Sequence, residues 1–204
     1  MKLALTSIFF IAAITLQAQT VTIGSQVWMT KNLDVDKFRN GDVIPEAKSE
    51  GEWKAYNDAN EAAWCYYDND PKNGEKYGKL YNWYAVNDPR GLAPVGYHIP
   101  SDAEWGKLVD YLGGEEKAGA KMKSKTGWNE DGNGTNSSGF SGLPGGYRGY
   151  NGAFLNVGLY GNWWSSSEVI TKFARYRSLI YGNGPVYRLD GNKGGGFSVR
   201  CLRD

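Results

Sequence analysis

β-forming residues alternate with polar ones from Thr20 to Met29, on both sides of the pair Gly24-Ser25. Two short alternating runs joined by two turn-forming residues are typical of a β-hairpin. The pattern therefore predicts a hairpin over residues 20–29.

The clearest helix signal follows Pro100. Within the run from Ser101 to Glu104, the serine oxygen can accept from the Glu104 backbone N–H while the glutamate reaches back, which makes a capping box. An apolar stripe at helical spacing follows, and Gly113-Gly114 would end the helix. Capping also accounts for the acidic residues of the first turn, without a catalytic role. The stripe consists of Trp105, Leu108, Val109 and Leu112.

The middle of the chain gives weaker signals. Residues 77–86 carry aromatic and aliphatic side chains at helical spacing, and we predict a helix from Tyr77 to Val86 that ends before Pro89, although aromatic residues also favour strands. Residues 34–62 are polar and mixed, and residues 68–74 are rich in turn formers. Both segments are predicted to be mostly loop.

From Lys121 onward, glycine-rich turns separate short β-prone runs, at residues 163–166, 174–181, 186–189 and 197–202. This pattern predicts an antiparallel sheet with long loops. A hairpin, then helices, then a sheet is the order of an α+β fold.

Residues 1–18 have the character of a secretory signal peptide. Lys2 is followed by an apolar run from Leu3 to Leu16 and by the small residue Ala18. The alternative is an uncleaved anchor, although the run is short for a membrane span. No cysteine lies near the predicted cleavage site, so a lipid anchor has no attachment point. We expect residues 19–204 to form a single domain that is secreted, periplasmic or on the cell surface.

The charge and the reactive residues narrow the function. The formal net charge is +1, so no basic excess points to nucleic acid. His98 is the only histidine, and a single histidine excludes most histidine-based metal sites and catalytic triads. A lone histidine is more often a packed, hydrogen-bonded residue than a catalyst. We therefore predict no catalytic residues and a non-enzymatic role.

Cys65 and Cys201 are the two cysteines of the chain. In an oxidising compartment their simplest arrangement is a disulfide. Two buried free thiols are the alternative, and a catalytic thiol is the least favoured.

No cofactor or metal is predicted, although calcium remains possible. The loop that begins at Asp131 has Asn136 and Gly142 where an EF-hand needs glycine and glutamate. The run Asp68 to Asp70 offers oxygens but has no obvious glutamate partner nearby.

The C-terminal runs interleave aromatic, arginine and amide residues. Tyrosine and arginine are enriched at binding surfaces because they combine contact area with hydrogen bonds. In the alternative interpretation, the aromatic residues simply build the core. The candidate ligand-binding residues are Trp164, Glu168, Arg175, Tyr176, Tyr181, Asn183, Tyr187, Asp190 and Asn192.

Several strings together resemble a known family. They include GSQVWMTKNL (residues 24–33), GKLYNWYAV (78–86), HIPSDAEW (98–105), LPGGYR (143–148), WWSSSE (163–168) and GFSVRC (196–201). They resemble the Fibrobacter succinogenes major paralogous domain, found in exported bacterial proteins. The resemblance covers nearly all of the chain after the signal segment.

That family is similar to the C-type-lectin-like superfamily. The similarity implies two helices packed on a twisted antiparallel sheet with long loops, and chain ends that lie close together. In C-type lectins a cysteine near the first helix pairs with one on the last strand, which agrees with a Cys65–Cys201 disulfide. In related lectin-like variable proteins the C-terminal strands and loops form the ligand face, which maps to residues 164–192.

The resemblance also bears on activity. Formylglycine-generating enzymes share the lectin-like core but use a cysteine pair in its C-terminal part, where this chain has only Cys201. The Glu-Pro-Asn, Gln-Pro-Asp and Trp-Asn-Asp triplets of calcium-dependent lectins do not occur. We expect an exported, non-catalytic domain that binds an extracellular glycan or protein. The alternatives are a structural module of the cell envelope and, less favoured, an oxidative enzyme.

Overall fold

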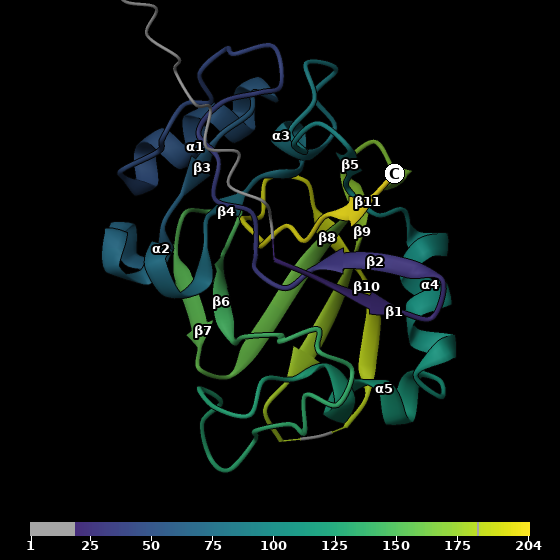
Figure 1. Ribbon diagram of the computed structural model, residues 1–204. Helices are drawn as coiled ribbons and strands as arrows, with labels where there is room; N and C mark the ends of the chain where they lie inside the picture. The colour runs from purple at the N-terminus through teal and green to yellow at the C-terminus, as the bar shows by residue number, and fades with distance from the viewer. Residues whose placement is uncertain (1–18, 183) are drawn as a thin grey trace, which may run out of the picture.

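The first and last strands of the described chain lie in one sheet. The structure is a computed structural model that describes residues 19–182 and 184–204, so the predicted signal peptide and the candidate residue Asn183 lie outside it. Strands β1 (Thr20–Ile23) and β2 (Gln26–Met29) form the predicted hairpin. β2 pairs with β11 (Leu202–Arg203), which pairs in turn with β5 (Tyr97–His98). The hairpin prediction is confirmed, and Figure 1 shows β11 beside it.

The larger sheet has five strands in the order β10-β9-β8-β6-β7. Its pairs are antiparallel except for β6 with β8, which are parallel. Three of the four predicted runs, at residues 163–166, 174–181 and 186–189, are therefore confirmed as strands of one sheet, with two further strands at its edge. The prediction is wrong for residues 197–202, because this segment makes only isolated bridges and its end enters β11 of the other sheet. A small third sheet joins β3 (Trp64–Cys65) to β4 (Leu80–Tyr81). The strands of the larger sheet are β6 (Gly145–Arg148), β7 (Phe154–Val157), β8 (Tyr160–Ile170), β9 (Phe173–Ile180) and β10 (Val186–Asn192).

The predicted capping-box helix is α4 (Asp102–Tyr111). The Ser101 hydroxyl accepts from the Glu104 backbone N–H, and the Glu104 carboxylate accepts from the Ser101 backbone N–H over 2.8 Å. Its predicted apolar stripe is buried. In Figure 1, α4 and α5 (Glu115–Met122) lie together on one side of the molecule.

Three local predictions need correction. The segment 77–86 is not one helix: α2 (Pro71–Tyr77) ends where that helix was expected to begin, and β4 and the short α3 (Trp83–Val86) follow. The reason is tertiary, because Leu80 and Tyr81 pair with β3 instead of continuing a helix. Residues 68–74 contain a 3₁₀ turn (Tyr67–Asn69) and the start of α2.

The predicted loop at residues 34–62 contains α1 (Glu50–Ala59). This helix begins with its own capping box, in which Ser49 pairs with Glu52. The sequence carried that signal, but no long apolar stripe follows it, and Trp53 is the helix's buried residue. The helices of the described residues thus exceed the two that the resemblance implied.

The core consists of three clusters of buried side chains. One lies between α4, α5 and the sheet and includes Trp28 and Trp105, whose ring centroids are 4.7 Å apart. The second surrounds Trp164, and the third surrounds Trp53 under α1. Tryptophan and tyrosine supply much of the buried volume, as the second interpretation of the aromatic residues anticipated.

The predicted disulfide is wrong. Cys65 and Cys201 are both buried and unpaired. Cys65 belongs to the cluster around Trp53 and Cys201 to the cluster around Trp164, so each thiol packs as a small apolar group in a different part of the core.

Candidate functional site

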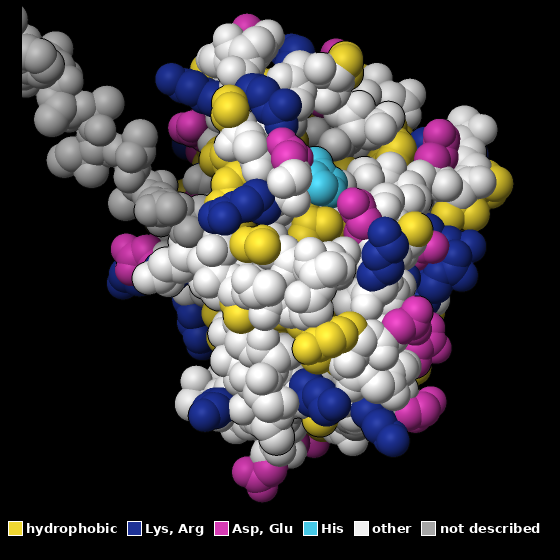
Figure 2. All heavy atoms as spheres, turned by 45° about the vertical axis from the view of Figure 1, so that its right-hand side comes forward, with side chains coloured by type: hydrophobic (Ala, Val, Ile, Leu, Met, Phe, Trp, Pro, Cys, Tyr) yellow, Lys and Arg dark blue, Asp and Glu magenta, His cyan; other side chains and the backbone are white. Residues whose placement is uncertain are grey.

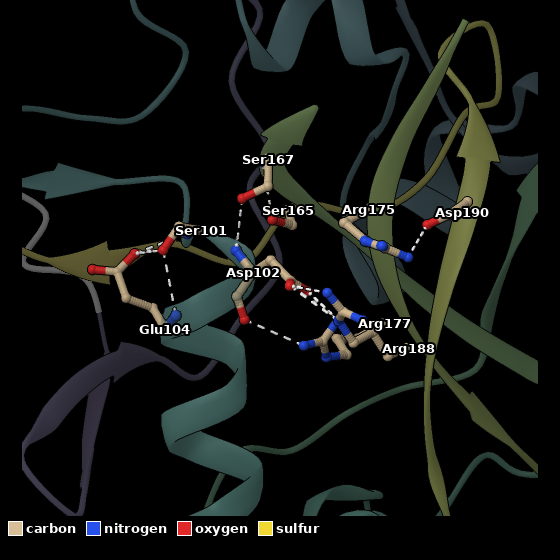
Figure 3. A network of polar contacts seen from close by, with 9 residues as sticks. All are labelled: Ser101, Asp102, Glu104, Ser165, Ser167, Arg175, Arg177, Arg188 and Asp190. Carbon is tan, nitrogen blue, oxygen red and sulfur yellow. Dashed lines mark hydrogen bonds and ion pairs between the residues drawn. The ribbon is translucent and has the colours of Figure 1, made fainter. Parts of the chain in front are cut away.

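Alternate rows of the five-stranded sheet face opposite sides. Trp163, Arg177 and Arg188 lie opposite one another across β8, β9 and β10. Both arginines donate to Asp102 at the start of α4, as Figure 3 shows, so this row faces the helices. Because neighbouring strand residues point to opposite sides, the alternate rows face away from α4. We call this second side the open sheet face, and it consists of Tyr147, Leu155, Tyr160, Asn162, Tyr176, Ser178, Ile180, Tyr187 and Leu189.

The open sheet face brings together two predicted binding residues, Tyr176 and Tyr187, with two that sequence analysis missed, Tyr147 and Tyr160. All four tyrosines are partly exposed. Tyr160 could have been found by alternation, because it lies four positions before the predicted residue Trp164 on the same strand. Tyr147 could not, since no strand was predicted at its position in β6.

Ring contacts hold two of these tyrosines, Tyr147 and Tyr176, over the core. Tyr176 packs on Phe197, with ring centroids 4.6 Å apart, and edge-on to Trp164 at 6.0 Å. Tyr147 contacts the same Phe197 ring at 5.8 Å. Burial, reinforced by the neighbouring phenols of Tyr147 and Tyr160, raises the pKa of Tyr176 to about 12. Tyr176 therefore stays neutral and can donate a hydrogen bond at physiological pH.

Beneath these rings lies a buried amide. Asn162 is 3% exposed, and its Oδ1 has no hydrogen-bond partner in the described part of the chain. It lies opposite Ser178 on β9, which lies opposite Tyr187 on β10. A buried polar atom without a partner costs stability, so its presence in the middle of a strand calls for an explanation.

The other predicted residues do not join this exposed group. Trp164 lies opposite Tyr176, on the same side of the sheet, but it is fully buried. Its Nε1 donates to the Tyr81 carbonyl over 2.8 Å, and its ring centroid is 4.3 Å from that of Phe197. Arg175 and Asp190 pair with each other on the side that faces α4 (Figure 3). Tyr181 packs against the core cluster that includes Trp28 and Trp105, between the helices and the sheet.

Two predicted polar residues lie near the ends of the strands. Glu168 forms an ion pair with Lys193, whose Nζ is 2.5 Å from Oε1. Asn192 lines a hollow at the end of β10, beside α1. The structure therefore gathers only part of the predicted set on one surface.

His98 is a surface residue held between two carboxylates. Its Nδ1 is 2.8 Å from Asp204 Oδ1 and its Nε2 is 3.0 Å from Glu104 Oε1. Figure 2 shows the imidazole at the surface beside acidic side chains. Burial acts to lower its pKa, but the hydrogen bonds with Asp204 and Glu104 outweigh this and raise the pKa above its ordinary value. This imidazole links β5 to the first turn of α4 and to the residue that follows β11.

The described residues contain no group of three or more His, Cys, Asp and Glu side chains arranged to hold a metal ion. In residues 19–182 and 184–204, no helix is both long and apolar enough to cross a membrane.

The model of one protein family, described as the Fibrobacter succinogenes major domain, matches residues 21–203. Neither a curated protein nor a solved structure matches the chain.

Proposed function

This chain belongs to the Fibrobacter succinogenes major domain family, and we propose that it is an exported, non-catalytic recognition domain. Its binding surface is the open sheet face, and its ligand is an extracellular glycan or protein. The observation that carries the proposal is the grouping of four partly exposed tyrosines from β6, β8, β9 and β10 above a buried amide whose oxygen has no partner in the described residues.

The chemistry of this face favours contact by stacking and hydrogen bonding. Its residues include no Asp, Glu, Lys, Arg or His, and Leu155 and Leu189 are 40% and 38% exposed. Tyrosine offers a large, stiff contact area together with a hydroxyl, which suits recognition of a protein or of sugar rings. Binding at this face depends little on salt, because no ion pair contributes to it.

The state of the thiols supports a non-catalytic role. Burial raises the pKa of both Cys65 and Cys201 to about 12, with Arg148 and Arg200 opposing the shift only in part. A thiolate is the reactive form of cysteine, so these buried groups are poor nucleophiles and poor metal ligands near neutral pH.

The proposal includes a C-type-lectin-like fold and export from the cytoplasm. Pairing of the terminal strands in one sheet, with helices beside a second antiparallel sheet, supports the fold. The apolar, signal-like character of residues 1–18 supports export.

The test is a binding screen of the chain without residues 1–18 against glycan arrays and envelope proteins. Tyr160→Ala and Tyr187→Ala are each expected to weaken a specific interaction about tenfold or more. Tyr111→Ala, which removes an exposed tyrosine of α4, is the matched control and should leave binding unchanged. Equal effects of all three variants, or no specific ligand at all, would argue for a structural envelope role.

A further inference from the structure

A hollow of about 420 Å³ lies at the end of the sheet, apart from the open sheet face. It is bordered by the C-terminal half of α1, by α3, by the turns before β7 and β9, and by the end of β10. We call it the α1–α3 groove. Its volume is within the range of roughly 300–1,000 Å³ that small-molecule sites occupy.

A network of amides fixes the wall of this groove. Asn57 Nδ2 donates to the Gly194 carbonyl over 2.8 Å and to the Tyr150 carbonyl over 3.2 Å. Asn57 Oδ1 accepts from Asn82 Nδ2 over 3.3 Å, and Asn82 is itself fully buried. Trp53 Nε1 donates to the same Gly194 carbonyl over 2.9 Å. The groove is therefore preformed, and a ligand would lose little affinity to ordering it.

Several donors that line the groove have no partner within the described residues. Asn192 Oδ1 accepts from the Gly194 N–H over 2.9 Å, which leaves the Nδ2 donor of that amide available. The Asn60 amide and the Lys172 ammonium likewise make no side-chain hydrogen bond or ion pair within residues 19–182 and 184–204. These groups come from the C-terminal cap of α1, the β8–β9 turn and β10, and they converge on one space.

The charge of the groove is positive. Asp58 supplies the lining carboxylate, and Lys54 holds it with Nζ 2.5 Å from Oδ2. Lys172 is left as an uncompensated cation. Donors therefore exceed acceptors, which favours a ligand rich in acceptor oxygens with at least one negative charge.

Two aromatic rings complete the lining. Tyr84 of α3 is partly buried, and Tyr150 is 62% exposed. Aromatic faces suit the C–H face of a sugar ring, while asparagine amides suit its hydroxyl groups.

We propose that the α1–α3 groove binds an acidic saccharide, a sugar ring that carries a carboxylate. Lys172 pairs with the carboxylate, and Asn60 and Asn192 donate to ring oxygens. This site is independent of the open sheet face, so either can fail without the other.

The experiment is calorimetric titration of the chain without residues 1–18 with oligogalacturonate, and in parallel with an uncharged galactose oligosaccharide. Saturable binding of oligogalacturonate is expected, at least tenfold tighter than binding of the neutral sugar. Lys172→Gln should abolish that preference, while Lys172→Arg retains it. Asn192→Ala should weaken binding of both sugars.

Lys125→Gln is the matched control, because Lys125 is an exposed lysine outside the groove. Thermal unfolding of each variant checks that it is folded. Tyr187→Ala should leave binding of oligogalacturonate unchanged, which separates this site from the open sheet face. The proposal would be overturned if oligogalacturonate showed no saturable binding or if both sugars bound equally well. It would also be overturned if Lys172→Gln and Lys125→Gln lost the same affinity for oligogalacturonate.

Discussion

The guanidinium of Arg177, on β9, donates to the carboxylate of Asp102 in the first turn of α4 over 2.7 Å. The Arg177 side chain is 4% exposed, whereas Arg188, which shares the same carboxylate, is 44% exposed. Burial acts to raise the pKa of Asp102, but the hydrogen bonds from Arg188 and Arg177 outweigh it and hold the pKa below its ordinary value. This interaction fastens the start of α4 to the central strands (Figure 3).

Asp102→Ala should lower the free energy of unfolding by about 3 kcal/mol, because it leaves the buried Arg177 cation without its partner. Urea denaturation measures the change. Arg188→Ala, on the exposed side of the same carboxylate, should cost only about 1 kcal/mol or less. Similar small losses in both variants would contradict the assigned role of Arg177.

The His98 imidazole should make stability depend on pH. Its folded-state pKa is raised, so its stabilising contribution is complete below the ordinary histidine value and is lost as pH rises through the raised value. Lys107 and Arg203 line the same hollow as Glu104 and Asp204 and add opposing positive charge.

Denaturant unfolding at about pH 6 and pH 8 tests this contribution. The native chain should lose stability between the two values relative to His98→Gln. An equal change in the free energy of unfolding between the two pH values in both proteins would show that His98 does not couple to the two carboxylates.

Asn162→Val should stabilise the fold by about 1 kcal/mol, because it removes a buried oxygen without a partner and introduces a residue that favours strands. The same change should weaken ligand binding at the open sheet face if the amide is kept for recognition. Thermal unfolding and the binding screen together separate the two effects. A loss of stability would show that Asn162 serves the sheet itself.

Both thiols should resist modification in the folded protein. Cys65 and Cys201 are fully buried and unpaired, and the pKa of each is about 12. An aromatic disulfide reagent should therefore react with neither cysteine at neutral pH and with both after unfolding in guanidinium. Intact mass under non-reducing conditions provides the control, since a loss of two hydrogens would reveal a disulfide that the structure lacks.

Local signals were sufficient where neighbouring residues decide the conformation. The capping box and apolar stripe of α4, and the alternation about Gly24-Ser25, depend on residues a few positions apart, and the structure contains both elements. The second capping box, at Ser49, was equally local but was missed because no long stripe follows it. The prediction of a helix at Leu80 and Tyr81 was wrong because these residues pair with β3, and this pairing overrides the helical spacing of the sequence.

The sequence by itself determined the α+β class, the family and which strand residues share a side, because alternation is a property of the extended backbone. Only the tertiary structure decided which side the helices cover. It buried Trp164, paired Arg175 with Asp190, separated the two cysteines and left the tyrosines of β6, β8, β9 and β10 partly exposed. Coverage depends on where distant segments pack, and a one-dimensional pattern does not contain that information.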